Sequence, residues 1–147
     1  MDRLEIKDWL KKYNVENYTI NEDLSIDVVG NFNCNDNKLT NLVGCPVSIG
    51  GNFSCGSNCL ESFFGCLLSV GGNFECSSNL LTSLEGCPVS IGGDFKKNRN
   101  RISDSELYLY DYTAEQVKGY YENKNLNKVL QDTLNEESGI GVKKKKL

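Results

Sequence analysis

The chain has 147 residues, a length that fits one domain, and 24% of them are charged, which is typical of a folded, water-soluble protein. The net charge is −4, and residues 30–95 hold a single basic residue, so that region is a poor candidate for binding nucleic-acid phosphates. No apolar run approaches the roughly 18–20 residues of a membrane span, and the first residues lack the apolar core of a secretory signal, so we expect a cytoplasmic protein of a bacterial or host cell.

The first predicted element is an amphipathic helix over residues 2–13. Its apolar face comprises Leu4 or Ile6, together with Trp9, Leu10 and Tyr13. We expect residues 1–23 to form a helical N-terminal cap that lies over the first unit of the region that follows.

From about residue 24 the sequence repeats with a period of 21 residues. The motif Gly-Asn-Phe-x-Cys begins at Gly30, Gly51 and Gly72, and the variant Gly-Asp-Phe-Lys-Lys begins at Gly93. Further columns of the repeat are Asn37/Asn58/Asn79/Asn100, Leu39/Leu60/Leu81/Ile102, Cys45/Cys66/Cys87 and Ile49/Val70/Ile91. Repetition at this spacing predicts a solenoid, in which each repeat forms one coil and buries its apolar face against the next.

Within a coil, residues 51–55 alternate as a strand does. Phe53 and Cys55 are expected to point inward, and the residues between them outward. Because neighbouring strands stack about 4.8 Å apart, equivalent residues of successive coils should form continuous ladders. The asparagine column, here Asn58, follows the strand, where its amide can bond backbone groups of its own and adjacent coils.

This pattern resembles the leucine-rich-repeat core L-x-x-L-x-L-x-x-N-x-L. Phe53, Cys55, Asn58 and Leu60 occupy its second, third, asparagine and last positions, and Gly50 stands where the first leucine belongs. Over residues 24–112 the chain is similar to leucine-rich-repeat-like proteins of bacteria and their phages. The resemblance implies a repeat solenoid with a parallel β-sheet on one face.

The C-terminal part is expected to be helical. Tyr108, Tyr110 and Tyr112 continue the repeat columns, and we interpret them as the core of a C-terminal cap. The segment Thr113 to Gln116 has the pattern of a capping box that opens a helix. A second helix is expected over residues 126–136, so residues 113–137 would complete the cap. Residues 138–147, which include the run Lys143–Lys146, are predicted to be a disordered basic tail.

The seven cysteines do not suggest a disulfide framework or a metal site. Their number is odd, their spacing is mostly that of the repeat, and the chain has neither a CxxC pair nor a histidine. We interpret the two repeated columns as small apolar core residues. Cys59 falls outside these columns and is expected to be an exposed or half-buried thiol without a catalytic base. We therefore predict no catalytic residue, no cofactor and no metal.

The candidate functional surface is the outward face of the strands. Its predicted partner-binding residues are Asn31, Asn33, Asp36, Asn52, Ser54, Asn73, Glu75, Asp94, Lys96 and Arg99. A merely solvated sheet face is an equally good interpretation, because the face lacks the aromatic anchors of typical binding sites. A basic cluster that could contact nucleic acid or an acidic protein patch comprises Lys96, Lys97, Arg99 and Arg101. Lys97 falls in the inward cysteine column, so we expect the regular ladder to end there.

Three functions are compatible with these observations. The first is a non-enzymatic protein-binding module, and the resemblance to phage repeat proteins suggests an inhibitor of a bacterial defence system, similar to an anti-CRISPR protein. The second is a protein that contacts nucleic acid through its basic C-terminal third. The third is a structural protein that self-associates through exposed coil edges. We expect a protein partner, no membrane partner, and a monomer or weak homo-oligomer.

Overall fold

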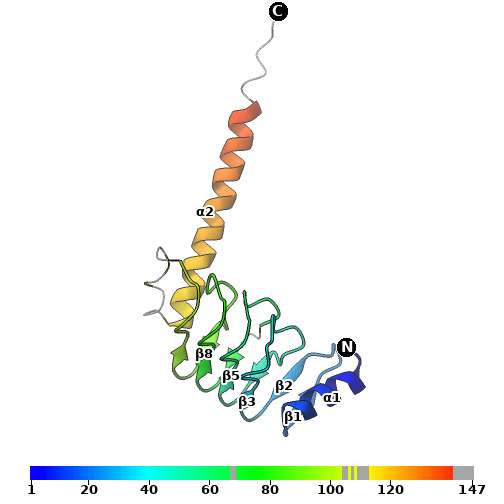
Figure 1. Cartoon of the computed structure of the whole chain (residues 1–147). Coiled ribbons are helices and arrows are strands. Elements are labelled where there is room, and N and C mark those ends of the chain that lie inside the picture. Colours follow the sequence, from blue (N-terminus) through cyan, green and yellow to red (C-terminus); the bar gives the residue numbers. More distant parts are fainter. Residues whose placement is uncertain (67–68, 104–105, 107, 109–112, 141–147) are drawn as a thin grey trace, which may run out of the picture.

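The structure, a computed structural model, describes residues 1–66, 69–103, 106, 108 and 113–140, with the side chains of residues 114 and 137–140 excepted. Helix α1 lies at one end of a stack of β-coils, and helix α2 leaves from the other end (Figure 1). Buried side chains of α1, the coils and α2 form one hydrophobic cluster. Among the described residues, no helix is long and apolar enough to cross a membrane.

Helix α1 (Arg3–Lys12) begins where the sequence predicted. The Asp2 carboxylate accepts hydrogen bonds from the backbone N–H groups of Leu4 and Glu5, and the Glu5 side chain accepts from the Asp2 N–H, which completes a capping box. Of the two alternatives for the apolar face, Ile6 is buried and Leu4 is 69% exposed. The helix therefore turns Ile6, not Leu4, toward the rest of the molecule.

The coils carry two sheets. One has the strand order β1 (Tyr18–Ile20), β2 (Ile26–Val28), β4 (Ser48–Ile49), β6 (Ser69–Val70), β8 (Ser90–Ile91). The other has the order β3 (Phe32–Asn33), β5 (Phe53–Ser54), β7 (Phe74–Glu75), β9 (Phe95–Lys96). All neighbouring strands are parallel except β1 and β2, and equivalent residues 21 positions apart lie side by side. The predicted repeat solenoid of 21-residue units is thus confirmed.

The expectation of a sheet on one face alone was incomplete, because the chain turns between two sheets in each coil, at a glycine pair in every coil after the first. A Cβ on Gly71 would overlap the carbonyl oxygen of Gly50, and a Cβ on Gly72 would overlap the side-chain oxygen of Asn52. The corner can therefore stack tightly only without side chains. On either side of it, Val70 and Phe74 both point into the coil.

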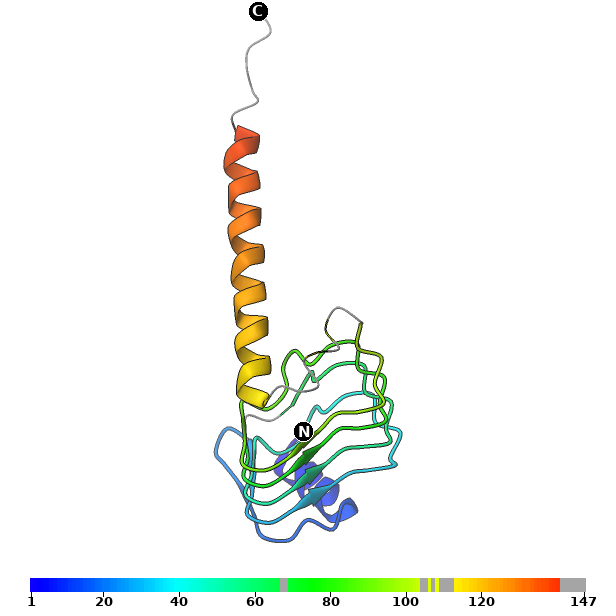
Figure 2. The ribbon, with the colours of Figure 1, turned by 90° about the vertical axis from the view of Figure 1, so that its left-hand side faces the viewer.

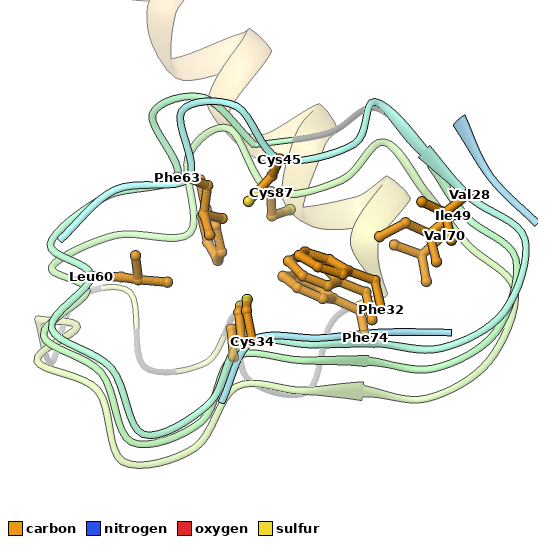
Figure 3. Close-up of a cluster of buried hydrophobic side chains, with 14 of the residues drawn as sticks. Val28, Phe32, Cys34, Cys45, Ile49, Leu60, Phe63, Val70, Phe74 and Cys87 are labelled. Carbon is orange, nitrogen blue, oxygen red and sulfur yellow. The ribbon is translucent and has the colours of Figure 1, made fainter. Parts of the chain in front are cut away.

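The interior consists of ladders of like residues. The rings of Phe32, Phe53, Phe74 and Phe95 stack with centroid separations of 5.4, 5.2 and 5.3 Å. Figure 3 shows Phe32 and Phe74 aligned in this stack, with the cysteine column of Cys34 beside it. Phe32, Phe53 and Phe74 are fully buried. Removal of their large apolar surfaces from water stabilises the stack.

The asparagine column satisfies the backbone of adjacent coils, as the sequence predicted. The Asn58 amide donates to the carbonyl oxygens of Cys34 and Cys55 at 2.9 and 3.0 Å, and its oxygen accepts from the Leu39 N–H at 3.0 Å. Asn79 repeats this arrangement one coil later. Each buried amide thus pairs backbone groups that would otherwise be buried without partners.

The two ends of the phenylalanine ladder are covered differently. At the first coil, Trp9 of α1 and Tyr13, the residue that caps the C-terminus of α1, contact Phe32, with ring centroids 5.5 and 5.7 Å away. At the last coil, the Lys97 ammonium lies 4.3 Å from the centroid of Phe95, a cation–π contact. Lys97 is buried, so the inward position that the repeat gives to this residue is confirmed.

Helix α2 (Ala114–Ile140) is one helix of 27 residues, whereas the sequence predicted two. The predicted capping box is present, since the Thr113 N–H donates to the Gln116 side chain and the Gln116 N–H donates to the Thr113 hydroxyl. The prediction of a disordered tail from residue 138 was wrong for residues 138–140, which are helical. Residues 141–147 lie outside the described part of the chain.

The base of α2 packs on the last coils. Val117 and Tyr121 are buried, and the Tyr121 hydroxyl donates to the Glu106 carboxylate at 2.8 Å and accepts from the Leu84 N–H at 3.1 Å. The Lys124 ammonium pairs with Glu106 at 2.6 Å. These contacts fix where the helix leaves the solenoid.

Candidate interaction surface

The predicted strand face exists on the second sheet. Asn33, Ser54, Glu75 and Lys96 occupy equivalent outward positions on β3, β5, β7 and β9. Because the preceding phenylalanine of each strand points inward, the next side chain points to solvent. The coils stack with these strands side by side (Figure 2). The column changes along the stack from an amide to a hydroxyl, an acid and a base.

Three of the predicted contact residues also hold the coils together. The side-chain oxygens of Asn31, Asn52 and Asn73 each accept a hydrogen bond, at 2.8 Å, from the backbone N–H 21 residues later. These side chains are exposed at the rim of the sheet, but that acceptor oxygen is already engaged. Asp94 is the last member of the column, and its own N–H is the donor to Asn73.

The turn that follows each strand of this sheet has a fixed backbone shape. Asp36, Ser57, Ser78 and Arg99 have φ angles of 57°, 52°, 57° and 56°, in the left-handed region. Non-glycine residues adopt this conformation at a cost, so packing of adjacent coils must hold it in place. Asp36 at one end of the stack and Arg99 at the other are both exposed.

The structure brings together three of the four predicted basic residues. Lys96, Arg99 and Arg101 are exposed on the last coil. Lys97 is not part of this surface, because its ammonium is buried over the Phe95 ring. The sequence had already assigned this residue to the inward column. There its ammonium contacts the last ring of the phenylalanine ladder.

All seven cysteines are free thiols. Cys34, Cys55 and Cys76 are fully buried, which agrees with their prediction as core residues, and Cys59 is half-buried. Burial raises the pKa of Cys55 and Cys76 well above the ordinary thiol value, and it raises the pKa of Cys87 to about 12 against a partial opposing effect of the Lys97 charge. The described residues hold no group of three or more Cys, Asp or Glu side chains placed to bind a metal.

Sequence reasoning missed one surface, which we call the α2 stripe. It comprises Leu126, Val129, Leu130 and Leu134, which are 57, 60, 51 and 55% exposed. The sequence analysis predicted these residues as part of a C-terminal helical cap.

Comparison of the chain with family models, curated proteins and solved structures finds no match. The interaction surfaces are therefore argued from the geometry of this chain alone.

The signal that could have located the stripe is the angular position of the apolar residues. At roughly 100° per residue, Leu126 lies about 180° around the helix from Val117. A single continuous helix must therefore expose one of these two apolar faces when it buries the other. If this segment formed two separate helices, each helix could bury its own apolar face.

Proposed function

We propose that the chain is a non-enzymatic protein-binding module that presents the outward face of β3, β5, β7 and β9 to a partner. The observation that supports this most is the column Asn33, Ser54, Glu75 and Lys96, held in register on successive coils. A rigid column with an acid next to a base offers a fixed charge pattern to a complementary surface. Because the backbone beneath is hydrogen-bonded from coil to coil, little conformational entropy would be lost on binding.

Finer parts of the proposal rest on resemblance. The asparagine ladder supports a leucine-rich-repeat-like type of solenoid, and the contacts of Trp9 and Tyr13 with Phe32 support a capping role for α1. The resemblance to repeat proteins of bacteria and phages supports inhibition of a bacterial defence protein by occupying its surface. The free thiols suit a reducing cytoplasm.

The test is a pull-down from bacterial lysates with two matched variants. Ser54→Arg places a large cation on the proposed face, and Ser90→Arg places it on an outward position of the other sheet. We expect a specific host protein to be retained by the wild-type chain and by Ser90→Arg, and lost by Ser54→Arg. Recovery of no specific protein across several hosts, or equal loss in both variants, would contradict the proposal.

A second candidate function is contact with nucleic acid, which is favoured by the exposed Lys96, Arg99 and Arg101 on one coil. Phosphate contacts of this kind weaken steeply as salt rises. Wild-type protein should then shift a labelled nucleic acid at low salt, and the double variant Lys96→Glu, Arg99→Glu should abolish the shift. The same shift by both proteins, or none by either, would exclude this cluster as a nucleic-acid site.

A further inference from the structure

The distal half of α2 carries an apolar face that its own chain does not cover. Lys124 contacts Glu106 and Asn125 contacts Glu85 where α2 leaves the coils, and the rest of the helix extends away from the solenoid (Figure 1). Leu126, Val129 and Leu130 are each more than half exposed. Exposed apolar residues gathered on one face in this way mark an interaction site more often than singly scattered ones do.

This stripe cannot be buried by a small rotation of α2 onto its own coils. The face that packs on the solenoid is set by Val117 and Tyr121, and it lies about 180° from Leu126. Farther along, that side continues as Lys124, which pairs with Glu106, and as the exposed Lys128. The side toward the solenoid is therefore charged where α2 leaves it, and the apolar stripe faces the opposite way.

We propose that a second copy of this chain covers the stripe, with the two α2 helices paired in parallel. Leu126, Leu130 and Thr133 follow the 4-3 spacing of a coiled-coil seam, and Val129 and Leu134 widen the face on either side of it. Because each solenoid packs on the face opposite to the stripe, the two solenoids lie on the outer sides of the helix pair. They therefore do not compete for the same space.

The polar residues along the stripe determine the orientation. Glu122 and Glu136 lie along one edge of this seam, in line with Val129, and Glu122 is also paired to Lys118 at 3.4 Å. The other edge, here called the amide edge, carries Asn127 and Leu134 and no charge at these positions. In a parallel pair the acidic edge of one helix faces the amide edge of the other, whereas an antiparallel pair sets acid against acid. Like charges across a helix interface are unfavourable, so the parallel pair is preferred.

The apolar stripe, from Leu126 to Leu134, is little longer than one heptad, so the interface is smaller than that of an obligate dimer. We expect a reversible dimer that dissociates on dilution. This pairing goes beyond the proposed strand-face binding, and it would present two strand faces at once. Two linked faces would raise the avidity for a partner that itself carries two sites.

Sedimentation velocity of the full chain over an about 100-fold range of concentration tests the pairing. Wild-type protein should pass from monomer to dimer as concentration rises. Leu130→Glu should weaken dimerisation at least about 100-fold, because it would bury a carboxylate in the seam. The matched control Lys128→Glu, on the opposite face, should dimerise as the wild type does. Both positions are exposed in the monomer, so near-UV circular dichroism should show unchanged packing.

A wild-type chain that stays monomeric at the highest concentration overturns the proposal. Equal dimerisation of Leu130→Glu overturns it too, since another surface would then be responsible. Oxidation of Leu126→Cys tests the orientation: a disulfide-linked dimer beyond the wild-type background supports the parallel pair. Cross-linking only when Leu126→Cys is mixed with Leu134→Cys would show an antiparallel pair and contradict it. Neither outcome depends on the strand face, so the two proposals fail separately.

Discussion

Asn79 shows how single residues hold adjacent coils together. Its amide group donates to the carbonyl oxygens of Cys55 and Cys76, both at 3.0 Å, and its oxygen accepts from the Leu60 N–H at 3.0 Å. Since the residue is buried, water does not readily replace these bonds. A stacked coil leaves such backbone groups in every repeat, and a short amide side chain at the turn can reach several of them at once.

Replacement of Asn79 by alanine should leave the Leu60 N–H without a partner and remove one of the two amide donors from each of the Cys55 and Cys76 carbonyls. An unsatisfied buried N–H costs about 1–3 kcal/mol and each further lost hydrogen bond about 1 kcal/mol, so we expect Asn79→Ala to lower the free energy of unfolding by about 3 kcal/mol. Asn52→Ala, which removes one exposed bond to Asn73, should cost about 1 kcal/mol. Urea denaturation measures both, and equal losses would show that the buried ladder has no special role.

The buried thiols make stability depend on alkaline pH. Cys87 has a pKa of about 12 in the folded chain, against an ordinary value of 9.0. Above pH 9 the unfolded chain loses this proton and the folded chain keeps it, so stability is complete below about pH 9 and falls as pH rises toward 12. Cys87→Ala should make that fall shallower, as measured by urea midpoints under reducing conditions. An unchanged slope would contradict the assignment.

At the scale of elements, the residue pattern predicted the strands of one sheet but not those of the other. The alternation of Phe53 and Cys55 predicted both the inward column and the register of one sheet. The second sheet was not missed for the length of its strands, because β4, β6 and β8 have two residues each, as do β3, β5, β7 and β9. It was missed because the resemblance to leucine-rich repeats implied a sheet on one face only. The glycine pairs were correctly expected to bend the chain, but the strands that precede them, β4, β6 and β8, were not predicted.

The continuity of α2 was missed for a different reason. Val117 and Tyr121 lie on one face, and Leu126 and Leu130 on the opposite face, a change of side that is typical of two separate helices. No proline or glycine interrupts residues 120–138, so the backbone can continue as one helix. Of the candidate site, the alternation predicted the outward column of Asn33, Ser54, Glu75 and Lys96. The α2 stripe required knowledge of which face was already packed.

Substitution of a phenylalanine should cost the most stability in the middle of the ladder. Phe74 is fully buried between the rings of Phe53 and Phe95, whereas Phe95 at the end is only partly buried. Phe74→Ala should therefore cost about 3–5 kcal/mol, and Phe95→Ala distinctly less. Thermal or urea unfolding compares the two variants. A larger loss at Phe95 would mean that the end of the ladder, not its interior, limits stability.

At the scale of the whole molecule, the open ends of the stack are covered by side chains that differ from the repeat. Trp9 and Tyr13 cover Phe32 at one end, and Lys97 covers Phe95 at the other. A solenoid needs atypical terminal units, because an uncovered coil would offer its apolar interior and unpaired strand edges to other chains. A charge in the inward column is one way to stop such growth.

Removal of the aromatic cover should therefore promote association through the first coil. We expect Trp9→Ala to expose part of the Phe32 ring, to lower stability by about 2–4 kcal/mol, and to cause concentration-dependent aggregation visible by light scattering. Leu4→Ala, at an exposed position of the same helix, is the control and should leave the protein soluble. Identical behaviour of the two variants would argue against a capping role for α1.

The claim on which the functional proposals depend is that equivalent residues of successive coils lie directly over one another. Nuclear Overhauser spectroscopy on protein with labelled phenylalanine rings tests it most directly. Ring-to-ring contacts should connect Phe32 with Phe53, Phe53 with Phe74, and Phe74 with Phe95, at centroid separations of 5.2–5.4 Å, and none should connect Phe32 with Phe74. Absence of the sequential contacts, or contacts between rings two coils apart, would contradict the stacked solenoid.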